Sequence, residues 1–265
     1  MRFLNIASGS TGNVTYIGSD HTHILVDTGI SRKRILAGLN EAGLTLEDID
    51  AILVTHEHMD HISSLGVLER TREIPVYATE GTIEEIRRAS GIGSFNTEVL
   101  HSVEIDTPFE IGDLKIKPLK VDHDAKDPVC YRIEQGTKSC AIVTDLGEYN
   151  EYLMKNLKEL DLLMLESNHD IRMLETGPYP YPLKMRILGK YGHLSNENSG
   201  EFLSQLLHDN IRHILLGHIS RENNTRELAK LAVENEVDAA DNKYKAGDFE
   251  IKTLRHDAAS EILEV

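Results

Sequence analysis

The stretch ILVTHEHMDH, residues 52–61, places three histidines and an aspartate within six positions directly after an apolar run. Side chains at positions i and i+2 of an extended chain point to the same side, so His56 and His58 can reach one metal ion together. Asp60 and His61 follow where the chain turns into the next helix, so they face a second point in space. Two adjacent metal ions explain this crowding better than one.

Imidazole and carboxylate ligands suit zinc, manganese or iron, and two such ions close together can hold a bridging hydroxide, which indicates a hydrolase. Two simpler interpretations of the stretch are a solvated loop that is rich in histidine and a single structural zinc site. The helical zinc-protease motif does not apply, because it needs histidines four positions apart.

Three further candidate ligands stand at the ends of expected strands. They are His123 in LKVDHDAKD, Asp145 in CAIVTDLG and His218 in RHILLGHIS. Seen alone, a histidine or aspartate at such a position is more often a turn residue than a ligand. Seen together with HEHMDH, the three residues favour a metal centre built from several strand ends.

The elements expected to position these residues alternate between strands and helices. Runs of apolar and β-branched residues bounded by glycine predict strands, and apolar residues at helical spacing predict helices. Strands are expected at 2–7, 14–18, 23–29, 51–55, 74–79, 109–121, 129–145, 162–166 and 213–218, with turns at Gly112 and Gly136. Helices are expected at 31–43 (closed by Gly43), at 61–71, after Ser195 as N-cap and at 224–236. This order fits two sheets faced by helices.

The size and composition of the chain limit the kinds of protein to which it can belong. A length of 265 residues suits one domain, residues 1–265, and two small domains are the alternative. A formal net charge of −16 argues against a protein that coats nucleic acid or anionic membrane by bulk charge, although bound metal ions can make a site locally positive. The only cysteines, Cys130 and Cys140, offer no disulfide framework, so a cytoplasmic location is expected. No apolar run approaches the length of a membrane span, and no particular protein partner is indicated.

The order of these motifs resembles the metallo-β-lactamase superfamily over nearly the whole chain. The resemblance implies an α/β fold (α+β in some schemes), arranged as a four-layer αββα sandwich. It also implies two divalent metal ions, either zinc or manganese with iron possible in principle, and Asp27 in LVDTG as a support of the metal loop. The implied ligands are His56, His58 and His123 for one ion, Asp60, His61 and His218 for the other, and Asp145 as the bridge.

The segment GHLSNENSGEFLSQLLHDNIRHILLGHIS, residues 192–220, is similar to the end pattern of ribonuclease Z. By that match His193 contacts the phosphate or protonates the leaving oxygen, the usual general-acid role of histidine. The glycine- and proline-rich arm with which ribonuclease Z holds transfer RNA is not recognisable here. Neither is the metal-binding cysteine of classical β-lactamases.

Three stretches resemble the bacterial YycJ/WalJ-type proteins, which are linked to 5′-to-3′ exonuclease action on DNA: residues 7–13, 165–170 and 177–196. The resemblance implies DNA as the substrate. Ser10 and Asn13 in the first stretch could hold a phosphate together with backbone N–H groups, or form a plain turn. Asn168 in the second stretch is expected to contact substrate, and an Asx-type turn is its alternative.

The third stretch interleaves tyrosines with cations shortly before His193. The residues are Tyr179, Tyr181, Lys184, Arg186 and Lys190. This mixture suits the stacking of a base or sugar and the neutralisation of phosphates. An amphipathic surface helix with two tyrosines packed inward explains it almost as well.

The predicted reaction is phosphodiester hydrolysis by the bridging hydroxide. Asp60 would orient that hydroxide as well as bind metal, and His193 would assist the departing nucleoside. One alternative is a small-molecule hydrolase that acts on a thioester, a lactone or a cyclic phosphodiester, which the acidic charge mildly favours. The other is a non-catalytic protein stabilised by metal.

Overall fold

A computed structural model describes residues 1–265, and the chain divides into two compact units. Unit 1 comprises residues 1–120, 125–137 and 255–264, and unit 2 comprises residues 121–124, 138–254 and 265. The prediction that residues 1–265 form a single domain is not tested by this division and stays a prediction.

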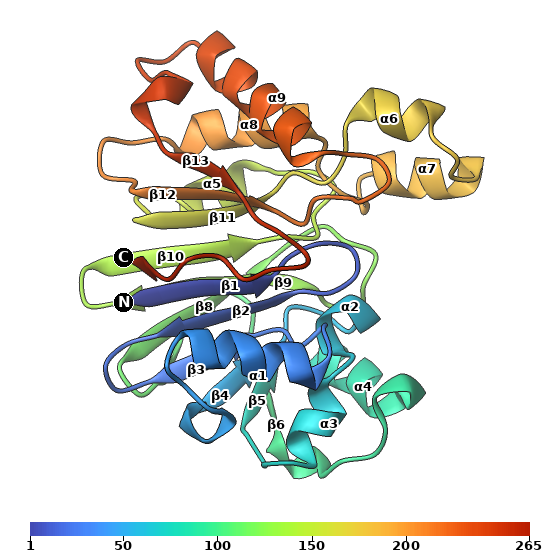
Figure 1. Ribbon diagram of the computed structural model, residues 1–265, viewed down its shortest axis with the longest axis vertical. Coiled ribbons are helices and arrows are strands. Elements are labelled where there is room, and N and C mark those ends of the chain that lie inside the picture. The colour runs from blue at the N-terminus through green and yellow to red at the C-terminus, as the bar shows by residue number, and fades with distance from the viewer. The chain divides into compact units, whose positions relative to one another are not determined.

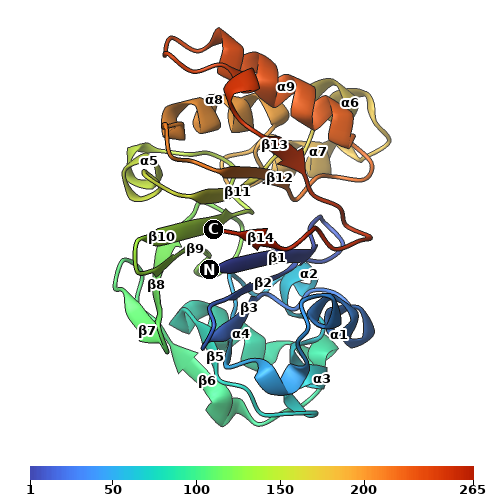
Figure 2. The same ribbon diagram turned by 60° about the vertical axis from the view of Figure 1, so that its left-hand side comes forward.

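Unit 1 contains a mixed sheet in which the strands follow the order β14-β1-β2-β3-β4-β5-β6 (Figure 1, with β14 labelled in Figure 2). β1 to β3 pair in antiparallel fashion, whereas β3 to β6 are parallel. The carboxyl ends of β3 and β4 therefore meet at one edge of the sheet. The strands are β1 (Arg2–Ala7), β2 (Val14–Gly18), β3 (His23–Val26), β4 (Ala51–Leu53), β5 (Val76–Ala78), β6 (Leu100–Ser102) and β14 (Leu263–Glu264).

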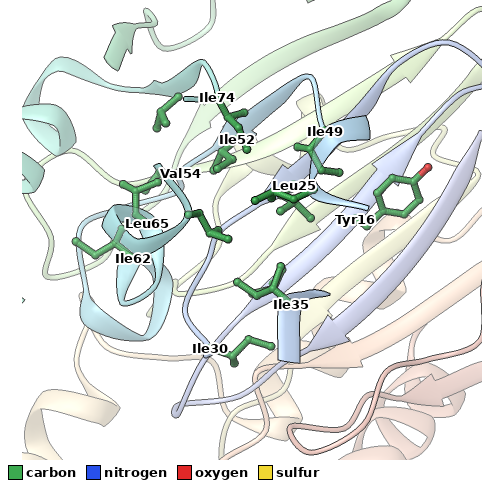
Figure 3. Close-up of a cluster of buried hydrophobic side chains, with 14 of the residues drawn as sticks. Tyr16, Leu25, Ile30, Ile35, Ile49, Ile52, Val54, Ile62, Leu65 and Ile74 are labelled. Atoms are coloured by element: carbon green, nitrogen blue, oxygen red, sulfur yellow. The ribbon is translucent and has the colours of Figure 1, made fainter. Parts of the chain in front are cut away.

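One face of this sheet is covered by helices, and the interface between them is the core of unit 1. Figure 3 shows Ile35 of α1 and Leu65 of α3 beside Leu25 and Ile52 of the sheet, all fully buried. The hydroxyl of Tyr16 lies at the edge of this core, 2.9 Å from Nδ1 of His23. The helices are α1 (Arg32–Glu41), α2 (Met59–Ile62), α3 (Leu65–Glu69) and α4 (Glu80–Arg88).

The prediction of one helix over residues 61–71 is wrong, because two short helices, α2 and α3, replace it. Ser63 and Ser64 interrupt the helical pattern. The Ser64 hydroxyl donates to the carbonyl of Ile30 at 2.5 Å, and its backbone N–H donates to the carbonyl of Thr28 at 3.0 Å. Serine competes for backbone partners in this way, so the pair ends one helix and starts the next.

Three antiparallel strands complete unit 1: β7 (Phe109–Ile111), β8 (Leu114–Lys120) and β9 (Val129–Gln135). Gly112, with a φ of 55°, forms the predicted turn between the first two. The buried Tyr131 of β9 donates its hydroxyl proton to the carbonyl of Val54 at 2.9 Å. β9 is thereby fixed beside the loop that follows β4.

Unit 2 is built on four parallel strands, β10 (Lys138–Val143), β11 (Leu162–Glu166), β12 (His213–Gly217) and β13 (Ile251–Thr253). Figures 1 and 2 both show α8 and α9 on one face of β11 and β12. The helices are α5 (Glu151–Asn156), α6 (Ile171–Thr176), α7 (Tyr181–Leu188), α8 (Asn196–Leu206) and α9 (Arg226–Ala239).

Local signals explain where these helices begin. Ser195 is the N-cap of α8, as predicted, and its hydroxyl accepts from the N–H of Asn198 at 3.1 Å. Thr225 caps α9 in the same way, and the helix runs to Ala239, beyond the predicted end at residue 236. Neither α8, α9 nor any other helix combines the length and apolar composition that a bilayer crossing requires.

Candidate metal-binding clusters

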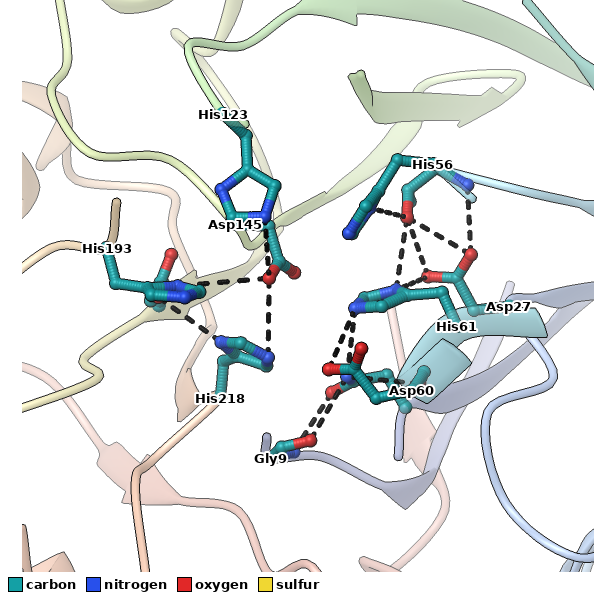
Figure 4. A network of polar contacts seen from close by, with 12 residues as sticks. Gly9, Asp27, His56, Asp60, His61, His123, Asp145, His193 and His218 are labelled. Atoms are coloured by element: carbon teal, nitrogen blue, oxygen red, sulfur yellow. Dashed lines mark hydrogen bonds and ion pairs between the residues drawn. The ribbon is translucent and has the colours of Figure 1, made fainter. Parts of the chain in front are cut away.

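The four candidate ligands of unit 1 lie in one short segment that runs from the loop after β4 into α2. The ring centroids of His56 and His58 are 4.6 Å apart, and those of His56 and His61 are 4.1 Å apart. A carboxylate oxygen of Asp60 lies 3.6 Å from Nε2 of His61. The segment HEHMDH thus brings three imidazoles and one carboxylate together, as Figure 4 shows for the labelled residues.

The loop after β3 holds this segment in place. Asp27 accepts hydrogen bonds from the N–H and hydroxyl of Thr55 at 2.9 and 3.1 Å, and its other oxygen lies 2.8 Å from Nδ1 of His61. The N–H of Thr28 donates to the carbonyl of His61 at 2.7 Å. A Cβ at Gly29 would lie 1.6 Å from the carbonyl oxygen of Asp60, so only glycine fits there. Asp27 therefore fixes the backbone at Thr55 and the ring of His61, while its role beside a bound metal ion stays a prediction.

The SGSTGN turn packs on the same segment. Asn13 is buried, its amide donates to the carbonyl of Gly9 at 3.1 Å, and its Nδ2 lies 3.1 Å from Nε2 of His61. Its backbone N–H donates to the carbonyl of Asp60 at 2.8 Å. Ser10, by contrast, is exposed at the tip of the turn. These contacts make Asn13 a support of the ligand loop, while substrate contact by Asn13 and Ser10 stays a prediction.

The candidate ligands of unit 2 come from separate segments. Oδ1 of Asp145 lies 3.8 Å from Nε2 of His123, 3.8 Å from Nδ1 of His193 and 3.4 Å from Nε2 of His218 (Figure 4). All except His193 are almost fully buried. Possible ligand atoms of His123, Asp145 and His193 lie within 4.8 Å of one another. The carboxylate of Asp145 therefore stands at the middle of three imidazoles.

Left-handed backbone recurs where ligands or their supports leave a strand. Asp27 after β3, Asp145 after β10 and His218 after β12 have φ angles of 63°, 60° and 52°. This conformation costs a non-glycine residue on the order of 1–2 kcal/mol, and such strain gathers at functional sites. At all three positions it turns a side chain away from the strand and toward a cluster.

Glu166, the last residue of β11, is a buried carboxylate that serves two histidines. Its Oε1 lies 2.7 Å from Nδ1 of His193 and 3.2 Å from Nδ1 of His218, and its Oε2 accepts from the N–H of Leu146 at 3.0 Å. Burial alone would raise the pKa of Glu166, but the two histidines bring it below its usual value. The sequence-based prediction treated Glu166 only as the end of a strand. A glutamate closing the apolar run LLML was the available signal.

Asn168 is buried, and its amide donates to the carbonyl of His218 at 2.9 Å. Its own carbonyl accepts from the amide of Asn224 at 3.0 Å and from the N–H of Ser220 at 2.8 Å. This network fixes the loop that carries His218, and substrate contact by Asn168 stays a prediction. The neighbouring His169 is also buried, with no hydrogen bond to either ring nitrogen, and burial lowers its pKa to about 4.

The hydrogen bonding of the rings shows that these residues fit divalent metal ions. Nδ1 of His61 faces Asp27, Nδ1 of His218 faces Glu166, and Nδ1 of His123 lies 3.1 Å from the carbonyl of Gly192. Each acceptor favours a proton on Nδ1, which leaves the lone pair on Nε2 to bind a metal ion, as in carboxylate–histidine–metal arrangements. Divalent metal ions are the cofactors that this set of nitrogen and oxygen donors takes.

A family model described as Beta-lactamase superfamily domain matches residues 22–219, a range that includes all the predicted metal ligands. Exodeoxyribonuclease YycJ of Bacillus anthracis is 38% identical over 88% of this chain and 88% of its own length. The chain belongs to the YycJ/WalJ family of the β-lactamase superfamily. Exodeoxyribonuclease WalJ of Streptococcus pneumoniae serotype 2 (strain D39) is 36% identical over 98% of this chain and 96% of its own.

The fold comparison agrees with the family. The metallo-β-lactamase fold protein YhfI of Bacillus subtilis superimposes with a TM-score of 0.72 at 16% identity, covering 98% of both chains. The predicted α/β class and metallo-β-lactamase fold, with two mixed sheets and helices, are thereby confirmed. The family and the donor sets together identify the chain as a metal-dependent hydrolase.

Proposed function

We propose that the protein is a 5′-to-3′ exonuclease that hydrolyses phosphodiester bonds of DNA with the help of two divalent metal ions. Two relatives that are 38% and 36% identical over most of the chain are named exodeoxyribonucleases. The polarity follows from the same family resemblance. Zinc and manganese are the proposed metals, and iron also suits the donors.

The ligand assignment predicted from the sequence forms part of this proposal. The ligands are His56, His58 and His123 for one ion, Asp60, His61 and His218 for the other, and Asp145 for both. When bound, such a pair of ions supplies a deprotonated water as nucleophile and stabilises negative charge on the phosphoryl oxygens. Asp60, whose side chain is 26% exposed, would orient the attacking water by accepting a hydrogen bond from it.

The observation that carries the phosphodiesterase function is the pair formed by His193 and Glu166. The carboxylate fixes the proton on Nδ1 of His193, so Nε2 is the atom that can carry a transferable proton. The His193 side chain is 17% exposed, unlike the buried carboxylate behind it, so a substrate can reach it. His193 would therefore bind a phosphate oxygen and give its proton to the leaving oxygen as a general acid.

The test is the digestion of 5′-labelled, 3′-labelled and circular DNA by the manganese-loaded protein, beside an Asp60→Ala control. We expect label to be lost from linear DNA, starting at the 5′ end, with circles intact and the control inactive. Asp48→Asn is a matched control, because it changes an exposed aspartate of unit 1 at the end of a short 3-10 helix. A metal-loaded protein that leaves every DNA intact would contradict the proposal.

One observation favours the small-molecule alternative. Arg186 and Lys190, which were predicted to meet phosphates, are paired with carboxylates, and the chain carries a net charge of −16. Salt separates the two functions, because a strand that contacts several phosphates binds more weakly as salt rises, whereas a neutral ester does not. We expect the KM for DNA to rise steeply with salt. A salt-independent KM, together with turnover of a thioester or lactone, would establish the alternative.

A further inference from the structure

We propose that the outer face of α7, together with Tyr191, binds the single-stranded DNA that leads to His193. This inference rests on the proposed function and names the surface on which its substrate lies. The sequence also allowed two tyrosines of this segment to pack inward. Tyr181 does not pack inward, because its exposed fraction is 73%.

The exposed face of α7 is apolar along its length. Tyr181, Met185 and Leu188 stand on successive turns, with exposed fractions of 73%, 47% and 38%. The buried Ile187 holds the opposite side of the helix in the protein. Figure 1 draws α6 and α7 as a pair beyond the carboxyl end of β11, and Tyr191, 55% exposed, follows the helix.

Close backbone packing joins this face to the unit 2 cluster. The N–H of His193 donates to the carbonyl of Ile187 at 3.0 Å, and the N–H of Asp124 donates to the carbonyl of Tyr191 at 3.1 Å. A Cβ at Gly147, two residues after Asp145, would lie only 2.2 Å from the carbonyl oxygen of Lys190. The backbone of Tyr191 is therefore fixed close to His193 and to Asp124, the residue that follows His123.

Two cations beside the exposed face of α7 are paired with carboxylates. Arg186 pairs with Asp124 through two hydrogen bonds, and Nζ of Lys190 lies 2.8 Å from Glu148 and 3.5 Å from Asp122. These pairs are partly exposed, so each contributes little stability and its cation can turn to a phosphate. A strand on this face would therefore meet exposed rings, and it would compete with carboxylates for Arg186 and Lys190.

The size of the surface favours a nucleic-acid strand over a second copy of the chain. An aromatic side chain covers about 150–250 Å², so the exposed parts of Tyr181, Met185, Leu188 and Tyr191 amount to roughly 400 Å². A stable protein interface needs about 800 Å² from each partner. Rings with cations beside them are the combination with which proteins bind single strands without reading their sequence.

The experiment compares two substrates of the manganese-loaded protein: a 5′-phosphorylated single-stranded oligonucleotide and bis(p-nitrophenyl) phosphate, a diester that carries no nucleotide strand. The variants are Tyr181→Ala and Tyr191→Ala, each beside its Phe counterpart, which keeps the ring. Leu231→Ala is the matched control, because Leu231 is an apolar residue of α9 with the same exposed fraction as Tyr191, 55%. For each protein, kcat/KM is measured on both substrates.

We expect each alanine variant to lower the ratio of kcat/KM for the oligonucleotide to that for the diester about fivefold or more, through KM. The phenylalanine variants and Leu231→Ala should keep the wild-type ratio. If wild type cleaves both substrates and the alanine variants keep its ratio, the α7 surface is refuted while the nuclease stands. If wild type cleaves the small diester alone, the proposed nuclease itself fails. A dimer in sedimentation that Met185→Glu dissociates would assign the face to a second copy and overturn the inference.

Discussion

The two ligand clusters are held in different ways. In unit 1, four candidate ligands share six consecutive positions, and the loop containing Asp27 and Gly29 fixes their backbone. In unit 2, each candidate ligand leaves a different segment, and one carboxylate, Glu166, orients two of the histidines. The first cluster is contiguous in the sequence and is held by neighbouring loops, whereas the second is assembled from separate segments. A substitution of a residue that supports the unit 2 cluster should therefore lower metal binding and activity more than an equivalent substitution in unit 1.

The largest effect is expected from Glu166→Gln. This change removes the negative charge that faces Nδ1 of both His193 and His218. Loss of such a support weakens metal binding about 10- to 100-fold, and misplacement of His193 should lower kcat on DNA by a further factor of about 100. Steady-state kinetics and manganese titration by calorimetry would measure both. A variant with near-normal kcat would show that Glu166 orients neither histidine.

A smaller effect is expected from Asp27→Asn, because Asp27 faces one histidine ring, that of His61. The amide can still accept from Thr55, so the loop should keep its shape while the support of His61 weakens. Manganese affinity should fall about tenfold. The comparison between the clusters would be wrong if Asp27→Asn proved as damaging as Glu166→Gln under the same titration.

Asn168→Ala separates a positioning role from a substrate-binding role. The change removes the amide that donates to the carbonyl of His218, and losing a buried hydrogen bond costs about 1–2 kcal/mol of unfolding free energy. We expect weaker manganese binding and a lower melting temperature, with the KM for DNA unchanged at saturating metal. A rise in KM at full metal occupancy would instead confirm the prediction that Asn168 contacts substrate.

The smallest effect concerns Glu69 of α3, which lies in unit 1 outside the ligand cluster. Burial raises its pKa to about 7, although its Oε2 accepts from the N–H of Ile74 at 3.0 Å. Because the folded pKa exceeds the unfolded value, the folded state binds the extra proton, and stability falls as pH rises from about 4.5 to 7. Glu69→Gln should remove this loss, raising stability by about 1 kcal/mol at pH 8 and hardly at all at pH 4. Thermal unfolding of wild type and Glu69→Gln at the two pH values would measure this gain in stability. A gain of the same size at both pH values would contradict the raised pKa of Glu69.

The difference between the clusters also explains what could be predicted from the sequence. The spacing of polar residues after an apolar run was enough to select four candidate ligands: His56, His58, Asp60 and His61. Apolar runs likewise predicted strands such as β1 and β11. The break after α2 was missed because Ser64 finds its partners in the distant loop of Thr28 and Ile30.

Residues that position a candidate ligand through tertiary contacts could not be predicted from the sequence either. In the sequence, Glu166 is recognisable only as the end of a strand. Its contact with His218 depends on the pairing of β12 with β11. No local pattern reveals that the amide of Asn168 donates to the backbone carbonyl of His218. Exposure of Tyr181 was likewise undetermined, because the apolar positions of α7 fit an inward or an outward face.

The most direct test of the central claim, that the chain digests DNA with the help of metal ions held by the predicted ligands, is the exonuclease rate of His61→Ala and His218→Ala against wild type. The three proteins would be measured on the same end-labelled DNA, with manganese content determined for each. We predict that either substitution alone abolishes digestion and lowers the manganese content, while circular dichroism shows a folded chain. Wild-type digestion by either variant would contradict the claim.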